Sequence, residues 1–289
     1  MKRRDILKSA SAAALCTTLP HTARAANSLP MAAPIHVGTV GLRTRDAESL
    51  ARWYAKAVGL RELRRDGATI WLGAGESPLL ALTQVEGLGL APAQEAGLFH
   101  TAFLLPTRRD LAHWIAMALD RQLPVTRTAD HRVSAAIYLT DPEGNGVEIY
   151  VDRPQEDWAW VDGEVQMGTF QLDVDGIMGQ LGLLPPNWQG APVGTTVGHV
   201  HLKVGDAPRA ARWWQDEIGF DAVSSRPDAV FLSTGGYHHH FAVNHWISPG
   251  AGRRSQQQTG LGFVELRRAQ SGGLAQAFED DWGTQIRLV

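Results

Sequence analysis

The sequence has little cysteine, no long apolar run and no block of one charge. Its 289 residues include a single cysteine, Cys16, which excludes an intramolecular disulfide and a thiolate metal site. No apolar run approaches the roughly 20 residues that a membrane span needs, so a polytopic membrane protein is excluded. The 27 basic residues form no stripe against 30 acidic ones, which argues against a nucleic-acid partner. Any metal must therefore be held by His and carboxylate side chains.

The first 26 residues differ in composition from the rest. Lys2, Arg3 and Arg4 precede a stretch of small and apolar residues that ends in Ala-Arg-Ala at 23–25. This order is typical of a bacterial signal peptide, and the paired arginines followed by Ile-Leu-Lys resemble the twin-arginine export signal. We expect cleavage of residues 1–26 and a periplasmic or secreted mature protein with no membrane partner. The alternative is an amphipathic N-terminal helix that stays on the protein.

The rest of the chain repeats itself over a long interval. Residues 38–42 match residues 198–202, Ala-Arg-Trp at 51–53 matches 211–213, and Gly59 falls on Gly219. The interval of about 160 residues is far longer than a solenoid repeat of roughly 20–50 residues. A duplication of whole domains is indicated, and the length suits about two domains.

Each copy predicts a strand, a helix and three further strands. Leu50, Trp53 and Tyr54 have helical spacing, and Gly59 ends the helix. A second unit predicts a strand over 99–105, a helix over 109–119 and two strands joined by a turn at 141–146. The end of the chain repeats this outline in shortened form, with a strand over 261–266, a helix near 274–278 and a strand over 284–289.

The sequence therefore predicts an α+β fold with four βαβββ modules, the fourth of them shortened. The modules form two tandem pairs, at 35–152 and 197–289. Residues 153–196 between them are rich in Pro, Gly and Trp and predict an ordered surface linker.

Three residues at matched module positions are candidate metal ligands. His100 and His199 lie in the opening strands of modules two and three, and Glu148 lies in the last strand of module two. Two imidazoles and one carboxylate on one face are the ligands of non-haem Fe(II) oxygenases. Each histidine taken alone could equally be a core residue. A complete set requires module two to face module three, because the matching positions of the other modules hold Thr39, Phe263 and Arg287.

Several motifs resemble one known superfamily. Gly-His-Val-His-Leu at 198–202 and Asp-Pro-Glu-Gly-Asn-Gly-Val-Glu-Ile-Tyr at 141–150 are similar to strand-opening and strand-closing motifs of the vicinal oxygen chelate (glyoxalase/bleomycin resistance/extradiol dioxygenase) superfamily. Residues 130–138, 152–160 and 235–240 resemble its catechol 2,3-dioxygenase-like branch. The resemblance implies two open barrels and an iron(II)-dependent extradiol dioxygenase, with Mn(II) as an alternative metal. Its substrates would be a catechol-type aromatic diol and O2.

The same resemblance implies roles for individual residues. His100, His199 and Glu148 would bind the metal, His239 would be the acid/base, and His131 and Tyr138 would touch the substrate oxygens. A strand over 237–241 would place His239 on one face, with His238 and His240 on the other. The alternatives are a solvated strand or adventitious metal binding for the triple-histidine run, and a core role for Tyr138. Trp158 and Trp160 could border the pocket or simply pack.

Two other classes of function stay open. A glyoxalase-type isomerase or transferase would use Zn, Ni or Mn and usually more carboxylate ligands. A metal-free small-molecule binding protein would not need the His100, His199 and Glu148 set at all. The sequence also leaves open which catechol is the substrate. It does not decide between a monomer and a homo-oligomer.

Overall fold

The computed structural model describes residues 29–269 and 273–289. The predicted signal peptide at 1–26 lies outside these residues, so its export remains a prediction. None of the helices in the described part of the chain is both long and apolar enough to cross a membrane.

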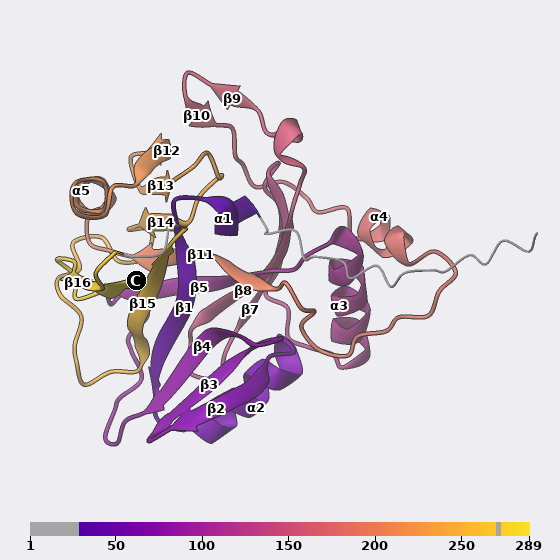
Figure 1. Cartoon of the computed structure of the whole chain (residues 1–289), viewed down its shortest axis with the longest axis horizontal. Helices are drawn as coiled ribbons and strands as arrows, with labels where there is room; N and C mark the ends of the chain where they lie inside the picture. Colours follow the sequence, from indigo (N-terminus) through magenta and orange to yellow (C-terminus); the bar gives the residue numbers. More distant parts are fainter. Residues whose placement is uncertain (1–28, 270–272) are drawn as a thin grey trace, which may run out of the picture.

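Modules one and four together form a seven-stranded sheet (Figure 1). After the short helix α1 (Leu29–Ala32), module one contributes β1 (Ile35–Thr44), α2 (Ala47–Ala57), β2 (Arg61–Asp66), β3 (Thr69–Ala74) and β4 (Ser77–Gln84). Module four contributes β15 (Gly260–Arg268), β16 (Gln276–Glu279) and β17 (Gln285–Leu288). The strand order is β16-β17-β15-β1-β4-β3-β2, so the last module completes the sheet that the first one starts.

Modules two and three form the second sheet, which has eight strands. Module two contributes β5 (Gly97–Leu104), α3 (Arg108–Asp120), β6 (Arg127–Asp130), β7 (Ser134–Thr140) and β8 (Gly146–Asp152). Module three contributes β11 (Thr196–Lys203), α5 (Ala207–Trp213), a π-helical turn η3 (Trp214–Ile218), β12 (Asp221–Arg226), β13 (Ala229–Ser233) and β14 (Phe241–Asn244). The order is β12-β13-β14-β11-β5-β8-β7-β6.

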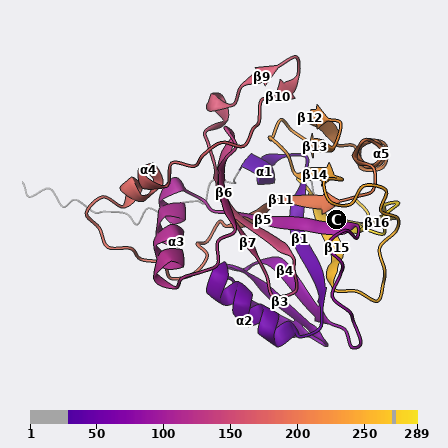
Figure 2. The same ribbon diagram turned by 180° about the vertical axis from the view of Figure 1, so that it is seen from behind.

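The segment between the tandem pairs has short elements of its own. These are η1 (Gln155–Asp157), β9 (Trp160–Val161), β10 (Glu164–Val165), α4 (Val174–Met178) and η2 (Gly179–Leu181). The β9–β10 hairpin projects from the body of the protein in both views (Figures 1 and 2), and α4 packs against α3. The segment thus contains short elements, and its role as a linker between domains remains a prediction.

The α+β class and the four modules are confirmed, but one predicted element is wrong. The helix expected near 274–278 is the strand β16, which pairs antiparallel with β17. A very short isolated helix forms few hydrogen bonds for the conformational freedom it loses, whereas pairing with β17 satisfies this backbone directly. Within residues 260–269 and 273–289, module four therefore contains three strands and no helix.

The two sheets combine modules from opposite halves of the chain. β5 pairs antiparallel with β11, and β1 pairs antiparallel with β15. Module two therefore does face module three, as a complete set of metal ligands requires. The tandem pairs describe the order of modules along the chain, and as a division into domains they remain a prediction.

Repeated capping residues start the helices at matched places. Asp46 and Asp206 precede α2 and α5, and their carboxylates accept hydrogen bonds from the backbone N–H groups of Ser49 and Arg209, both at 2.9 Å. A side chain at this position satisfies one of the free N–H groups of the first turn. The same local signal therefore sets the strand-to-helix turn in modules one and three.

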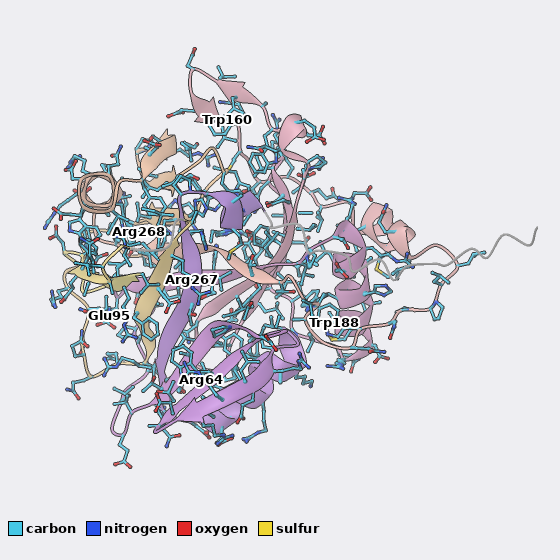
Figure 3. All side chains as sticks on the ribbon, viewed as in Figure 1. Arg64, Glu95, Trp160, Trp188, Arg267 and Arg268 are labelled. Atoms are coloured by element: carbon cyan, nitrogen blue, oxygen red, sulfur yellow. The ribbon has the colours of Figure 1, made fainter. Side chains whose placement is uncertain are left out.

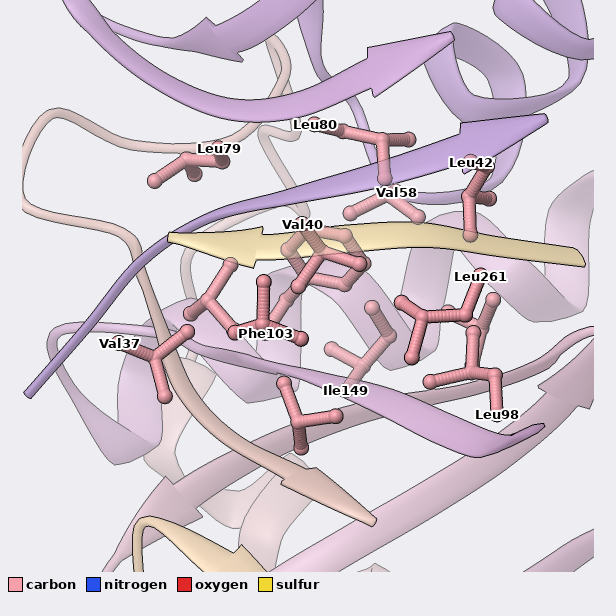
Figure 4. Packing of buried hydrophobic residues seen from close by; sticks show 14 of the residues in the cluster. Val37, Val40, Leu42, Val58, Leu79, Leu80, Leu98, Phe103, Ile149 and Leu261 are labelled. Atoms are coloured by element: carbon pink, nitrogen blue, oxygen red, sulfur yellow. The ribbon is translucent and has the colours of Figure 1, made fainter. Parts of the chain in front are cut away.

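One apolar core lies between the two sheets. Figure 4 shows Val37 and Val40 of β1 beside Phe103 of β5, Ile149 of β8 and Leu261 of β15. Successive side chains of a strand point to opposite faces. Because Phe103 faces this core, His100, Ala102 and Leu104 of the same strand face the other side of the eight-stranded sheet. That second face carries the candidate site.

Candidate metal centre

Three neighbouring strands bring three ligand atoms to one point. His100 lies on β5, Glu148 on β8 and His199 on β11, and these strands are adjacent in the sheet. The Nε2 atoms of His100 and His199 lie 3.0 and 3.1 Å from the same Glu148 oxygen, Oε2. The two Nε2 atoms are 3.3 Å apart. All three side chains are buried, at 5% exposure or less.

The triangle has the size that one ion requires. With metal–ligand bonds of about 2.1 Å, neighbouring ligand atoms lie about 3.0 Å apart in an octahedron and about 3.4 Å apart in a tetrahedron. The three observed separations fall within this interval. Two imidazoles and one carboxylate with open positions are the donor set of non-haem iron(II) oxygenases. His100, Glu148 and His199 therefore fit a single divalent ion, and they are the group with this geometry in the described part of the chain.

The protonation states also suit a metal. Burial alone would raise the pKa of Glu148, but its contacts with His199 and His100, including a hydrogen bond from each, outweigh burial and hold that pKa well below its usual value. Burial lowers the pKa of His199 to about 4, against the opposing effect of Glu148. Near neutral pH these two groups are an anionic carboxylate and a neutral imidazole, the forms that bind a metal without first losing a proton.

In the seven-stranded sheet, the positions that correspond to the three metal ligands hold side chains that bond to their own neighbours. Thr39 donates a hydrogen bond to the backbone carbonyl of Pro78 at 3.0 Å. The guanidinium of Arg287 lies over the ring of Phe263, 3.8 Å from its centroid. No comparable donor set stands at these positions, as the sequence predicts.

His131 and Tyr138 form a hydrogen-bonded pair beside the triad. Nδ1 of His131 lies 2.6 Å from the carbonyl oxygen of Gly168, so this nitrogen carries a proton. Nε2 is then an acceptor in the neutral ring, and it receives the hydroxyl proton of Tyr138 at 2.7 Å. Burial and the charge of Glu148 raise the pKa of Tyr138 well above 10, with Arg127 opposing them. Tyr138 is therefore a neutral phenol.

The prediction of a strand over 237–241 is wrong. β14 begins only at Phe241, and residues 237–240 are a loop. The loop follows a turn in which Gly235 and Gly236 both have positive φ, at 66° and 74°, a conformation open to glycine. His238 and His239 therefore do not alternate between opposite faces. Their Nδ1 atoms lie 2.8 Å apart in a direct hydrogen bond.

A chain of hydrogen bonds sets the proton positions on these two rings. Nε2 of His238 lies 2.8 Å from Oδ1 of Asp152 and donates to it, so in a neutral His238 ring Nδ1 would be an acceptor. In that state the proton between the rings belongs to Nδ1 of His239. Nε2 of His239 is left unprotonated, on a ring that lines the cavity and lies 4.2 Å from the ring of His199. His239 thus offers a base to whatever occupies the cavity.

His240 lies apart from this chain. Its Nε2 donates to the carbonyl of Pro30 at 3.2 Å, and its Nδ1 accepts from the hydroxyl of Ser233 at 3.1 Å. Burial lowers its pKa to about 3, with the bond to Pro30 opposing. It is fully buried and does not line the cavity.

All six predicted site residues border one cavity of about 110 Å³. Sequence reasoning missed several of its other walls. His201 follows His199 by two positions on β11 and so shares its face, and its Nε2 lies 2.8 Å from the Asn244 amide; this spacing could have revealed it. Other wall residues gave no sequence signal. Phe99 and Arg127 lie near predicted site residues in the chain, and other segments supply the rest: Met167, Gly168, Thr169, Arg226, Phe231 and Trp246.

The two linker tryptophans do not border this cavity. Trp158 is buried, with its ring 5.7 Å from that of Tyr237. Trp160 is 40% exposed on the β9–β10 hairpin (Figure 3). Trp246, which follows β14, is the tryptophan that lines the cavity.

Comparisons with known proteins agree on one superfamily. Residues 36–149 match the model of the Glyoxalase/Bleomycin resistance protein/Dioxygenase superfamily. A catechol-2,3-dioxygenase from Bacillus subtilis (strain 168) is 33% identical, covering 80% of this chain and 82% of the relative. A biphenyl-2,3-diol 1,2-dioxygenase 3 from Rhodococcus globerulus is 30% identical, covering 43% of this chain and 68% of that protein.

Solved structures show the same fold. A putative dioxygenase from Bacillus subtilis subsp. subtilis str. 168 superposes with a TM-score of 0.59 and 16% identity, covering 88% of this chain and 84% of the other. Glyoxalase I from Zea mays gives a TM-score of 0.53 and 15% identity, covering 88% and 92%. At such identities the likeness concerns the fold alone.

Proposed function

Because the chain belongs to the glyoxalase/bleomycin resistance protein/dioxygenase superfamily, in its catechol 2,3-dioxygenase-like branch, we propose that it is an iron(II)-dependent extradiol dioxygenase. Its substrates would be a catechol-type aromatic diol and O2. One observation carries the proposal: the His100, Glu148 and His199 donors open onto the cavity that also holds His239 and the His131–Tyr138 pair. The names of the two curated relatives support it.

The cavity suits a single aromatic ring beside a metal. Its volume of about 110 Å³ is similar in scale to an engineered cavity of about 150 Å³ that binds benzene. Phe99, Phe231 and Trp246 supply apolar walls. When bound, iron(II) would supply a Lewis acid that orients the diol and O2 and passes electron density between them. His100, Glu148 and His199 would hold it, and Mn(II) fits the same donors.

His239 would take a proton from a diol hydroxyl. Its Nε2 is the free nitrogen of the ring, since Nδ1 is engaged by His238. Asp152 holds His238 in the tautomer that accepts this bond, so His238 and Asp152 are positioning residues for the base. A base held in the correct protonation state contributes typically about 10²–10⁴-fold to a rate.

The His131–Tyr138 pair would hold and later return a proton at the ring oxygens. In the resting pair the Tyr138 hydroxyl donates to His131. A proton taken up by Nε2 of His131 would release that hydroxyl to donate toward the substrate instead.

In the proposed reaction the carbon–carbon bond next to the diol breaks, and both atoms of O2 enter the product, a muconic semialdehyde type of compound. No external reductant is needed, because the ring itself is oxidised.

The cavity favours this reaction over the glyoxalase type. Among the residues described by the structure, Glu148 is the only carboxylate that lines it, whereas the glyoxalase-type alternative would usually use more carboxylate ligands. A metal-free binding protein would have no use for three buried donors that converge on one point.

The test measures the reaction and the metal together. Protein loaded anaerobically with iron(II) should consume one O2 per catechol and form a semialdehyde, while metal-stripped protein should not. The control variant is His113→Ala on α3, which lies outside the cavity and should retain turnover. Absence of O2 uptake across neutral, anionic and cationic catechols, with iron bound, would refute the proposal. Metal-dependent turnover of a methylglyoxal–glutathione adduct instead would favour the glyoxalase class.

A further inference from the structure

The geometry points to a narrower class of substrate: catechols that carry a carboxylate or similar anionic group on the ring, recognised by Arg127 and Arg226. The inference rests on the proposed function and adds to it the charge of the ring substituent that lies away from the diol.

The two arginines come from opposite edges of one sheet. Arg127 begins β6 and Arg226 ends β12, the outermost strands of the eight-stranded sheet. Both line the cavity that contains the triad. Two edges that are separated by six intervening strands meet at one cavity only because the sheet is strongly curled. The curvature therefore brings one guanidinium from each edge to the same cavity.

These charges have no acidic partner. In the part of the chain that the structure describes, neither Arg127 nor Arg226 forms an ion pair with a carboxylate. Glu148 is the only acidic residue of the cavity wall, and its charge is directed to the metal position. A cavity bordered by two cations without acidic partners and by one engaged anion attracts negatively charged ligands and repels positively charged ones.

Each arginine is exposed on its edge strand, has a contact that orients it and keeps most of its donors free. The Arg127 guanidinium lies over the Tyr138 ring, 4.3 Å from its centroid. Arg226 donates through Nη2 to the backbone carbonyl of Met167 at 3.0 Å. A guanidinium has five N–H donors in a planar fork that matches a carboxylate. Arg226 therefore keeps donors for a ligand, and its one hydrogen bond is to Met167, which also lines the cavity.

The cavity would hold the diol and the anionic group of such a substrate at different places. The diol would lie at the triad, and Phe99, Phe231 and Trp246 would border the ring. A carboxylate on the ring or on a short side arm would then be able to reach the guanidinium groups. Arg127 also touches Tyr138, so its loss would disturb a predicted catalytic group. Arg226 is hydrogen-bonded to the Met167 carbonyl and lies near the Phe231 ring. Because neither contact involves a predicted catalytic group, Arg226 is the better residue to vary.

The main experiment compares matched substrates. For the iron-loaded protein, kcat/KM is measured with 3,4-dihydroxyphenylacetate, 4-methylcatechol and dopamine, which are anionic, neutral and cationic. The anionic catechol should be preferred, and the cationic one should be the poorest. Arg226→Gln should lower the anionic-to-neutral ratio of kcat/KM by about 10-fold, mostly through KM, because a charge-assisted hydrogen bond is lost. Arg226→Lys should restore part of the ratio. The control is Arg212→Gln, an exposed arginine of α5, which should leave the ratio unchanged.

Two further readings support or overturn the inference. Raising the salt from 0.1 to 1 M shortens the Debye length from about 10 to about 3 Å and should reduce the anionic preference. Binding of 4-hydroxyphenylacetate, followed anaerobically by tryptophan fluorescence, should exceed that of its neutral alcohol analogue and should weaken in Arg226→Gln. This binding test does not depend on turnover. If no catechol is cleaved, the proposed function fails. If neutral catechol is cleaved at least as well as the anionic one, or Arg226→Gln lowers both alike, the anionic class is wrong and the proposed function stands.

Discussion

The loop with three consecutive histidines allows a sharp test of the acid/base assignment. His239→Ala removes the ring whose free Nε2 borders the cavity, so kcat should fall by about 10²–10⁴-fold. His239 is not one of the three donors of the triad, so the variant should keep one iron per chain. It should also keep most of its affinity for the catechol. Iron content and steady-state rates, measured on the same samples, separate loss of the base from loss of the metal.

The neighbouring substitutions act as graded controls. His238→Ala leaves His239 in place but removes the acceptor for its Nδ1–H group and the contact with Asp152. Loss of a group that orients a functional histidine costs roughly 10–100-fold in metal sites, and we expect a similar loss in kcat here. His240→Ala should lower the free energy of unfolding, because His240 is fully buried. Its kcat per folded molecule should stay near that of the wild type.

The expected order of loss in kcat is therefore His239, then His238, then His240. All three variants delete the same side chain within one loop, so general damage to the loop should appear in each. Should His239→Ala keep near-normal turnover while His238→Ala is strongly impaired, the base would be His238. Equal losses in all three variants, with iron retained, would mean that the loop acts only as a structural unit.

Three shorter predictions concern the metal, acid stability and export. His199→Ala should lose tight iron binding and the rise in Tm that iron gives the wild type; one retained iron per chain, by elemental analysis, would contradict the triad. Burial lowers the pKa of His240 to about 3 in the folded protein, whereas in the unfolded chain this histidine takes up a proton below about pH 6.5. The unfolded state therefore binds more protons, and the free energy of unfolding falls as the pH falls. Denaturant titrations should show His240→Gln losing about 2 kcal/mol less than the wild type between pH 7 and 5, and parallel losses would refute this. Arg3 and Arg4 lie outside the described residues; their replacement by lysine should hold the protein in the cytoplasm, and unchanged fractionation would count against twin-arginine export.

Local signals were sufficient for most of the fold. Helical spacing at Leu50, Trp53 and Tyr54 and the turn at 141–146 mark elements that the structure contains. The duplication made visible by residues 38–42 and 198–202 led to the four modules. The error at 274–278 has a clear cause, because the partner strand β17 decides that segment through backbone pairing, and pairing across a sheet leaves little trace in local periodicity.

The candidate site was predictable where strand position alone placed a residue. His100, Glu148 and His199 occupy matched module positions, and the structure brings them within hydrogen-bonding distance of one another. Arg127 and Arg226 could not be found in this way, since sheet curvature brings their edges together. The relation between His238 and His239 was also out of reach, because it depends on a loop held by side-chain hydrogen bonds and not on strand alternation.

The pairing of β1 with β15 and of β5 with β11 affects when the protein can form during synthesis. Ile35 pairs with Arg268, and Val200 pairs with Thr101, so each sheet needs a strand that leaves the ribosome long after its partner. A nascent chain that has released only modules one and two has neither sheet complete and only two of the three donors. Contacts so distant in sequence form slowly, and the exposed strand edges invite mispairing until they close. Metal capture should therefore follow release of module three, and closure of the first sheet should come last.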